Sequence, residues 1–238
     1  MRSLLVLIAV VMAGLVVGMR AQAAADQAPS HPAGSVGQGT SDPPPKWGIF
    51  AGYAAMETNN HNFHFGPNIN AFALDYDENG HGFEIGEVRN LNRYFGIVGL
   101  FDAHFSSNQF DNFVPKCGQP PCPAENLDIN PSLFRFTAGP EVAFRNHTRV
   151  TPFADVLFGA AHSRATFRLS EAAGRFSSTE GENGFAANFA AGLEVRVARQ
   201  FSFRGSLDYG KAFVGSSALP SQLVDSVGFS TALLFRFH

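Results

Sequence analysis

Apolar and polar residues alternate one by one over long stretches of this chain, most regularly within residues 133–163. One row of the first half contains Phe134, Phe136, Ala138, Pro140, Val142 and Phe144. The other row contains Arg135, Thr137, Gly139, Glu141, Ala143 and Arg145. Such alternation predicts a β-strand, because successive side chains leave opposite faces. A polar turn at residues 146–149 then leads into a second strand at residues 150–163.

The same pattern recurs along the chain and predicts eight strands, each long enough to cross a bilayer at a tilt. They are expected at residues 47–56, 82–90, 94–105, 133–145, 150–163, 184–197, 201–211 and 224–238. Short turns alternate with long polar segments, which are expected at about residues 57–81, 106–131, 168–183 and 213–222. Outer-membrane barrels have tight periplasmic turns and long external loops. The pattern therefore predicts an all-β fold, an eight-stranded antiparallel up-and-down transmembrane β-barrel.

A soluble, lipocalin-like barrel would show the same alternation with its apolar row turned inward. The apolar rows here end in aromatic residues, and the polar rows mix charges with small residues that suit a narrow lumen, such as Gly96 and Gly192. Acids and arginines are nearly balanced in these rows, as buried charges require. We therefore expect a charge network that plugs the lumen, formed by Glu84, Asp102, Arg135, Glu141, Arg145, Asp155, Glu194, Arg196, Arg204, Asp208 and Arg236.

Two charged residues, Glu87 and Arg89, fall on the row that carries Phe83 and Ile85 and is expected to face lipid. A position near the periplasmic rim would tolerate both charges. A β-bulge, which inserts one extra residue into a strand, would instead turn them inward.

Composition agrees with a barrel and excludes other classes. Charged residues make up 16% of the chain, phenylalanine occurs 25 times and mean hydropathy is −0.02, so this is no helical membrane protein. The formal net charge of −3 includes no basic excess, which argues against nucleic acid as a partner.

The N-terminal segment reads as an export signal. A short positive start is followed by an apolar run at residues 4–17 and by small residues suited to cleavage. We expect a signal helix over residues 1–23, with cleavage after residue 25 as an alternative, a disordered Pro/Gly/Ser-rich linker over 24–45 and the barrel over 46–238. Without Arg2 and Arg20, 15 basic and 20 acidic residues remain, near −5. The competing interpretation is an uncleaved N-terminal anchor.

Cys117 and Cys122 bracket a Gly-Gln-Pro-Pro turn in the second long loop. In an exported chain this spacing favours a disulfide that staples the loop. A metal site would need two further ligands. A redox-active pair would require two cysteines that are closer in sequence and lie at a helix.

Catalytic and metal chemistry have only weak signals. His104 and Ser106 could belong to the triad of a lipid-modifying hydrolase, but His104 lies on the row expected to face the lumen. His162 and Ser163 are no stronger candidates for a catalytic pair. Oxygen ligands at Asp75, Asp77, Glu78 and Asn79 have roughly calcium-loop spacing but lack the distal glutamate. We expect no enzyme, no metal and no cofactor.

Several stretches resemble a known family. They are residues 92–98 with 102–105, residues 136–140 leading to 149–154 and 157–162, and residues 230–238. Together they are similar to the bacterial outer-membrane protein β-barrel domain family, in particular the transmembrane part of outer-membrane protein A, over residues 47–238. The resemblance implies that Phe235 and Phe237 belong to the terminal signal read by the barrel-assembly machinery, although His238 ends the chain.

The expected protein is a monomeric, non-enzymatic barrel of the bacterial cell outer membrane. Its expected partners are outer-membrane lipids, lipopolysaccharide and the barrel-assembly machinery. The long external loops suit a role in envelope integrity or surface recognition. The alternatives are a small-solute pore, a lipid-A-modifying hydrolase and a soluble lipocalin-like binder.

Overall fold

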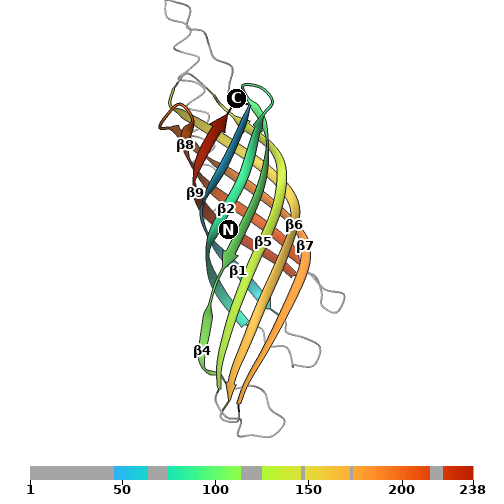
Figure 1. Ribbon diagram of the computed structural model, residues 1–238. Coiled ribbons are helices and arrows are strands. Elements are labelled where there is room, and N and C mark those ends of the chain that lie inside the picture. The colour runs from blue at the N-terminus through green and yellow to red at the C-terminus, as the bar shows by residue number, and fades with distance from the viewer. Residues whose placement is uncertain are drawn as a thin grey trace, which may run out of the picture. The chain divides into compact units, whose positions relative to one another are not determined.

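The computed structural model describes residues 46–63, 74–113, 125–145, 148–171, 174–214 and 222–237 (Figure 1). The chain divides into two compact units, Met1–Pro44 and Pro45–His238, and the described residues belong to the second. The predicted signal peptide, the whole predicted linker, and both cysteines, Cys117 and Cys122, lie outside the described residues. No helix in the described ranges is long and apolar enough to span a membrane.

Nine strands form one sheet within the described residues. They are β1 (Trp47–Phe63), β2 (Leu74–Asn90), β3 (Phe95–Phe105), β4 (Asn108–Phe113), β5 (Glu125–Ala143), β6 (Val150–Glu171), β7 (Gly174–Arg196), β8 (Phe201–Val214) and β9 (Gln222–Phe237). Their order is β3-β2-β1-β9-β8-β7-β6-β5-β4, and β3 also pairs with β5. This last pairing closes the sheet into a barrel.

The wall of the barrel has eight positions, because β3 and β4 share one of them. The two short strands follow each other along β5, separated only by Ser106 and Ser107. Every pairing is antiparallel, and β1 closes the ring against β9. The short connections and the end of β9 lie together at the top of Figure 1, and β4 lies at the bottom. The predicted eight-stranded antiparallel barrel is confirmed.

Strand boundaries at the loop end differ from the prediction. β2 begins at Leu74, and β4 and the start of β5 lie where a long loop was expected. β6 continues to Glu171, and β7 already begins at Gly174. The loop predicted at residues 168–183 is therefore wrong. In the extensions of β5 and β6 the outward positions are polar, as at Asn126, Arg164 and Arg168, whereas Ile129 and Ala165 are buried. The outward apolar row from which the strands were predicted is therefore missing there.

Exposed and buried residues alternate as a transmembrane barrel requires. On β5 the side chain of Phe136 is 64% exposed, whereas that of Glu141 is fully buried. A lipocalin-like arrangement would reverse these two values. On β5 the outward row therefore carries phenylalanine, and the inward row carries the charges.

Glu87 and Arg89 are both exposed on the outward row of β2. The strand pairs without interruption from His81 to Arg89 with β1 and from His81 to Asn90 with β3, so the alternative of a bulge is wrong. The two charges lie close to the turn that follows β2, at the rim of the barrel.

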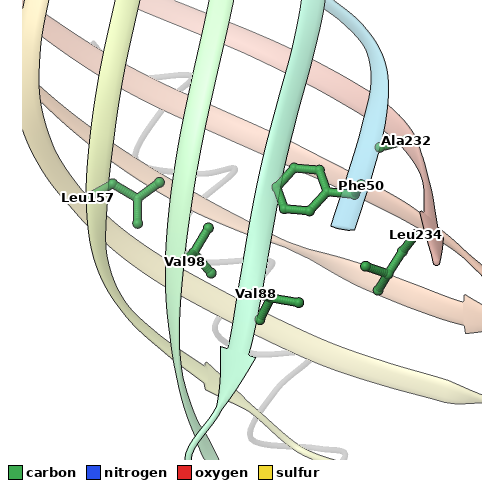
Figure 2. Packing of buried hydrophobic residues seen from close by; sticks show 6 residues of the cluster. All are labelled: Phe50, Val88, Val98, Leu157, Ala232 and Leu234. Atoms are coloured by element: carbon green, nitrogen blue, oxygen red, sulfur yellow. The ribbon is translucent and has the colours of Figure 1, made fainter. Parts of the chain in front are cut away.

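The interior also holds apolar side chains, which the charge-filled lumen of the prediction did not include. One cluster lies toward the turn end and contains Phe50, Val88, Val98, Leu157, Ala232 and Leu234, which point into the barrel from five strands (Figure 2). A second cluster lies toward the loop end and contains Leu133, Ala161, Ala186, Ala212, Val214 and Val224. Charged and apolar layers therefore share the lumen.

Candidate functional site in the barrel lumen

Ten of the eleven charged residues predicted for the lumen lie on seven strands, β2, β3 and β5 to β9, and Arg145 follows the end of β5 at Ala143. Those that the structure buries are Glu84, Asp102, Arg135, Glu141, Arg145, Asp155, Glu194, Arg204 and Arg236. Asp208 is partly buried. Arg196 is exposed, and its assignment to the network is wrong: β7 ends at this residue, where the wall no longer encloses the side chain.

The first group of ion pairs, the turn-end cluster, consists of Glu141, Arg145, Asp155, Glu194, Arg204 and Arg236. Arg204 is its centre. Its guanidinium donates to Glu141 at 2.7 Å, to Asp155 at 2.9 Å and to Glu194 at 3.0 Å. One arginine on β8 therefore joins carboxylates from three other strands, β5, β6 and β7.

The two remaining arginines complete the turn-end cluster. Arg145 donates to the second oxygen of Glu141 at 2.8 Å, and Arg236 donates to Glu194. Three arginines thus face three carboxylates, so the cluster is neutral as a whole. Such balance matters because a buried charge that loses its partner costs several kcal/mol.

Two inward phenylalanines hold the Arg204 guanidinium. Its carbon lies 3.5 Å from the ring centroid of Phe153 and 5.1 Å from that of Phe50. A guanidinium over an aromatic face is stabilised by the negative charge of the ring face. These two residues were not predicted as part of the site, although both lie on the inward rows of their strands.

The second group, the middle cluster, contains Glu84, Asp102, His104, Arg135 and Asp208. Arg135 donates to Asp102 at 2.7 Å, and the same oxygen lies 3.1 Å from Nε2 of His104. Three carboxylates here face one arginine and one histidine, so this cluster lacks the charge balance of the turn-end cluster.

Hydroxyl groups supply the remaining contacts of the middle cluster. Ser206 donates to Asp208 at 3.1 Å and lies 2.8 Å from the hydroxyl of Ser230. Arg135 also donates to Ser226 at 3.4 Å. The serines were not predicted as site residues, but their inward position follows from the alternation of β8 and β9.

A cavity of about 20 Å³ lies among the residues of the middle cluster. Asp102 Oδ2, His104 Nδ1 and Asn188 Oδ1 are buried atoms without a hydrogen-bond partner among the described residues, and all three residues line this cavity. The volume corresponds to roughly one water molecule, which would satisfy such atoms. The cavity is therefore suited to water and is too small for an organic ligand.

The residues proposed for a hydrolase triad do not form one. His104 faces the lumen beside Asp102, whereas the hydroxyl of Ser106 accepts a hydrogen bond from Asn108 at 3.4 Å. His162 is exposed, and its Nδ1 lies 2.8 Å from the side-chain oxygen of Asn183. Neither histidine is paired with its candidate serine.

The segment from Asp75 to Asn79 has oxygen ligands at roughly the spacing of a calcium-binding loop. The segment is part of β2, not a loop, and the side chains of residues 75–78 lie outside those that the structure describes. Across the described residues, no group of three or more His, Cys, Asp and Glu side chains is placed to hold a metal ion.

No family model matches the chain, and a search of curated proteins finds no match. Among solved structures, Ail, the attachment invasion locus protein of Yersinia pestis, in complex with the heparin analogue sucrose octasulfate, is similar at 22% identity over 80% of this chain and 99% of that chain, with a TM-score of 0.45.

Two further solved structures are similar. Neisserial surface protein A has 12% identity over 80% of this chain and 97% of that chain, with a TM-score of 0.48. The outer-membrane protease OmpT from Escherichia coli has 9% identity over 82% of this chain and 98% of that chain, with a TM-score of 0.44. Each of these TM-scores is below 0.5, so the similarities carry no argument about the fold or the function of this chain.

Proposed function

We propose that this chain is an integral, non-enzymatic protein of the bacterial outer membrane, with a lumen closed by its own side chains. Its role is surface recognition or envelope integrity, carried out by the part of the barrel that projects from the bilayer. The observation that carries the proposal is the reversed polarity of the barrel, with ion pairs buried inside and an apolar belt outside.

The apolar belt is long enough to span the hydrocarbon core of a bilayer. On β7 the outward residues from Phe185 to Val195 are apolar throughout, namely Phe185, Ala187, Phe189, Ala191, Leu193 and Val195. A tilted strand needs about 9–11 residues to cross the hydrocarbon core. This stretch meets that length, and neighbouring strands carry exposed apolar residues beside it, such as Phe158 and Phe203.

The closed lumen favours a structural barrel over a solute pore. Arg204 and its three carboxylates reach across the interior at the turn end. Phe50, a member of the apolar cluster drawn in Figure 2, has its ring centroid 5.1 Å from the guanidinium carbon of Arg204. The cavity of the middle cluster has the volume of about one water molecule, so solutes have no room there.

Surface recognition is supported by an extension of the barrel whose outward face is polar. The outer extension consists of residues 125–131, 163–171 and 174–183, which continue β5, β6 and β7 beyond the belt. Arg164, Arg168 and Thr179 are exposed there, and the hydroxyls of Thr166 and Thr179 lie 3.2 Å apart across the strands. A continuous sheet above the membrane would present polar groups in fixed positions.

Export and assembly complete the proposal. A cleaved signal peptide would carry the chain to the periplasm, and the terminal strand with Phe235 and Phe237 would be read by the barrel-assembly machinery. Phe235 is exposed on the outward face of β9, and its ring centroid lies 5.2 Å from that of Phe201. The barrel would then function as a monomer among outer-membrane lipids and lipopolysaccharide.

A matched pair of arginine substitutions tests which surface meets lipid. Phe189→Arg places a charge in the middle of the belt and should destabilise the inserted barrel by about 2–4 kcal/mol, whereas Thr179→Arg in the outer extension should change stability little. The measurement is urea unfolding in lipid vesicles, followed by heat-modifiable migration on gels. Equal effects of the two substitutions would contradict the proposal.

The competing functions have separate readouts. A solute pore would produce channel currents in planar bilayers, and a hydrolase would change the mass spectrum of lipid A in cells that express the chain. A soluble binder would be absent from the detergent-extracted outer-membrane fraction. We expect none of the three results.

A further inference from the structure

The turn end of the barrel is surrounded by exposed cations. They lie before β1, at the ends of β2 and β7 and in three of the short turns. We call this set the basic collar: Lys46, Arg89, Arg93, Arg149, Arg196 and Arg199. Glu87 is the one exposed acidic residue that the described part of the chain places at this end. The rim is therefore strongly positive, although the whole chain has a net charge of −3.

Backbone hydrogen bonds bring members of the collar together. The amide of Arg196 donates to the carbonyl of Arg149 at 2.7 Å, which joins the β5–β6 and β7–β8 turns. The amide of Asn90 donates to the carbonyl of Lys46 at 2.9 Å, which places Lys46 beside the end of β2 that carries Arg89. The collar therefore follows the rim and does not depend on a single turn.

Aromatic residues fix the depth of the collar. The guanidinium carbon of Arg89 lies 5.0 Å from the ring centroid of Trp47, and that of Arg93 lies 5.7 Å from the ring of Tyr94. Tryptophan and tyrosine at the end of an apolar belt lie at the level of the lipid headgroups. The collar cations are therefore level with lipid phosphates.

The collar differs from the arginines of the lumen in its lack of internal counter-ions. Arg204, Arg145 and Arg236 are each paired with a buried carboxylate. In the described part of the chain, the ion pairs within 4.0 Å include none of the collar residues. Unpaired cations at headgroup depth are complementary to an anionic surface.

We propose that the basic collar binds the phosphate groups of anionic phospholipids in the leaflet at the turn end of the barrel. This inference rests on the proposed placement of the barrel in a bilayer. It adds a lipid class and a named binding surface, which the apolar belt alone does not specify, because the belt contacts acyl chains of any lipid.

The test measures lipid selectivity with spin-labelled lipids. The full chain is refolded into phosphatidylcholine vesicles, and the association of spin-labelled phosphatidylglycerol is compared with that of spin-labelled phosphatidylcholine. We expect phosphatidylglycerol to be favoured by about fivefold, which is the effect of one well-placed cation near an anionic headgroup. Added salt should weaken this preference because it screens exposed charges.

Substitutions assign the preference to the collar. The triple variant Arg149→Gln, Arg196→Gln and Arg199→Gln should lose most of the preference. A second variant, Lys46→Gln with Arg89→Gln, tests the other side of the rim and replaces the triple variant if that one fails to fold. The matched control Arg164→Gln with Arg168→Gln removes two exposed arginines from the outer extension and should keep the preference.

The outcomes separate this inference from the proposed function. Insertion into phosphatidylcholine vesicles, seen by heat-modifiable migration, reports on the barrel placement alone. Failure to insert would overturn both proposals. Insertion without a preference for phosphatidylglycerol, or a preference that survives both collar variants, would overturn the collar proposal and leave the barrel placement intact.

Discussion

Arg204 has the most extensive set of contacts among the buried charges. It pairs with three carboxylates and lies against two aromatic rings, and every one of these partners comes from a different strand than its own. The side chain therefore connects parts of the barrel wall that the backbone ladder alone does not link. Its removal should affect the barrel as a whole.

We predict that Arg204→Leu destabilises the barrel by about 3–5 kcal/mol, because three buried carboxylates lose their shared counter-ion. Urea unfolding in vesicles measures the loss. Arg199→Leu, an exposed position in the β7–β8 turn, is the control and should stay within about 0.5 kcal/mol of the parent. A loss at Arg204 no larger than that of the control would show that the ion pairs do not stabilise the fold.

Gly159 is a second residue whose replacement should be costly. A Cβ atom added there would lie 1.8 Å from the carbonyl oxygen of Phe136 on the paired strand, so the two strands would have to separate. We expect Gly159→Ala to cost about 1–3 kcal/mol in the same unfolding experiment, as overpacking does. Gly205→Ala is the matched control, since its Cβ would approach no atom closer than 3.8 Å.

At the residue scale, the burial of the charged side chains could be predicted from the sequence more accurately than the ion pairs that they form. Alternation assigns a face to each residue, and the near balance of acids and arginines indicates pairing. The partners of Arg204 lie 10 to 63 positions away in sequence, however, and depend on the stagger of the strands. Stagger is fixed by closure of the barrel, which no local pattern encodes.

The closing seam between β1 and β9 is the element on which the barrel depends, since it joins the first strand to the last. Tyr53 and Thr231 are direct partners across this seam, and both point outward. We predict that the double variant Tyr53→Cys, Thr231→Cys forms a disulfide on oxidation, because paired residues on one face lie within bridging distance. Mass spectrometry of peptides from the folded barrel detects the link.

The control for the seam moves one cysteine by a single position. In Tyr53→Cys, Ser230→Cys the second side chain points into the lumen, so the two sulfurs leave opposite faces of the wall. Oxidation of this control without oxidation of the first pair would mean that the register of the seam is shifted by one residue.

At the element scale, the strands within the membrane were predictable and their extensions were not. The apolar belt enforces alternation, because lipid demands an apolar face next to a polar lumen. Beyond the bilayer the outward face of β6 and β7 meets water and is polar, as at Arg164, Arg168 and Thr179, so the lipid-facing apolar row ends before the strands do. A loop was therefore expected at residues 168–183, although β6 continues to Glu171 and β7 begins at Gly174.

The whole molecule should sit in the bilayer with Trp47 at the headgroup level of its turn end. Trp47 is the only tryptophan of the chain, so its fluorescence reports on one depth. We predict stronger quenching by lipids brominated near the glycerol than by lipids brominated near the chain ends. Stronger quenching by the deep bromines would place the rim inside the hydrocarbon core and contradict the proposed position of the belt.

Trp47 and Phe237 are paired residues at one edge of the closing seam. The ring of strands consequently has no structural start, and a short peptide joining these two residues would make one more hairpin turn. A circular permutant with this junction, opened anywhere between Val214 and Gln222, should fold to the same barrel. Both ends of such a chain would then emerge on the loop side, opposite to the end at which Trp47 and Phe237 pair.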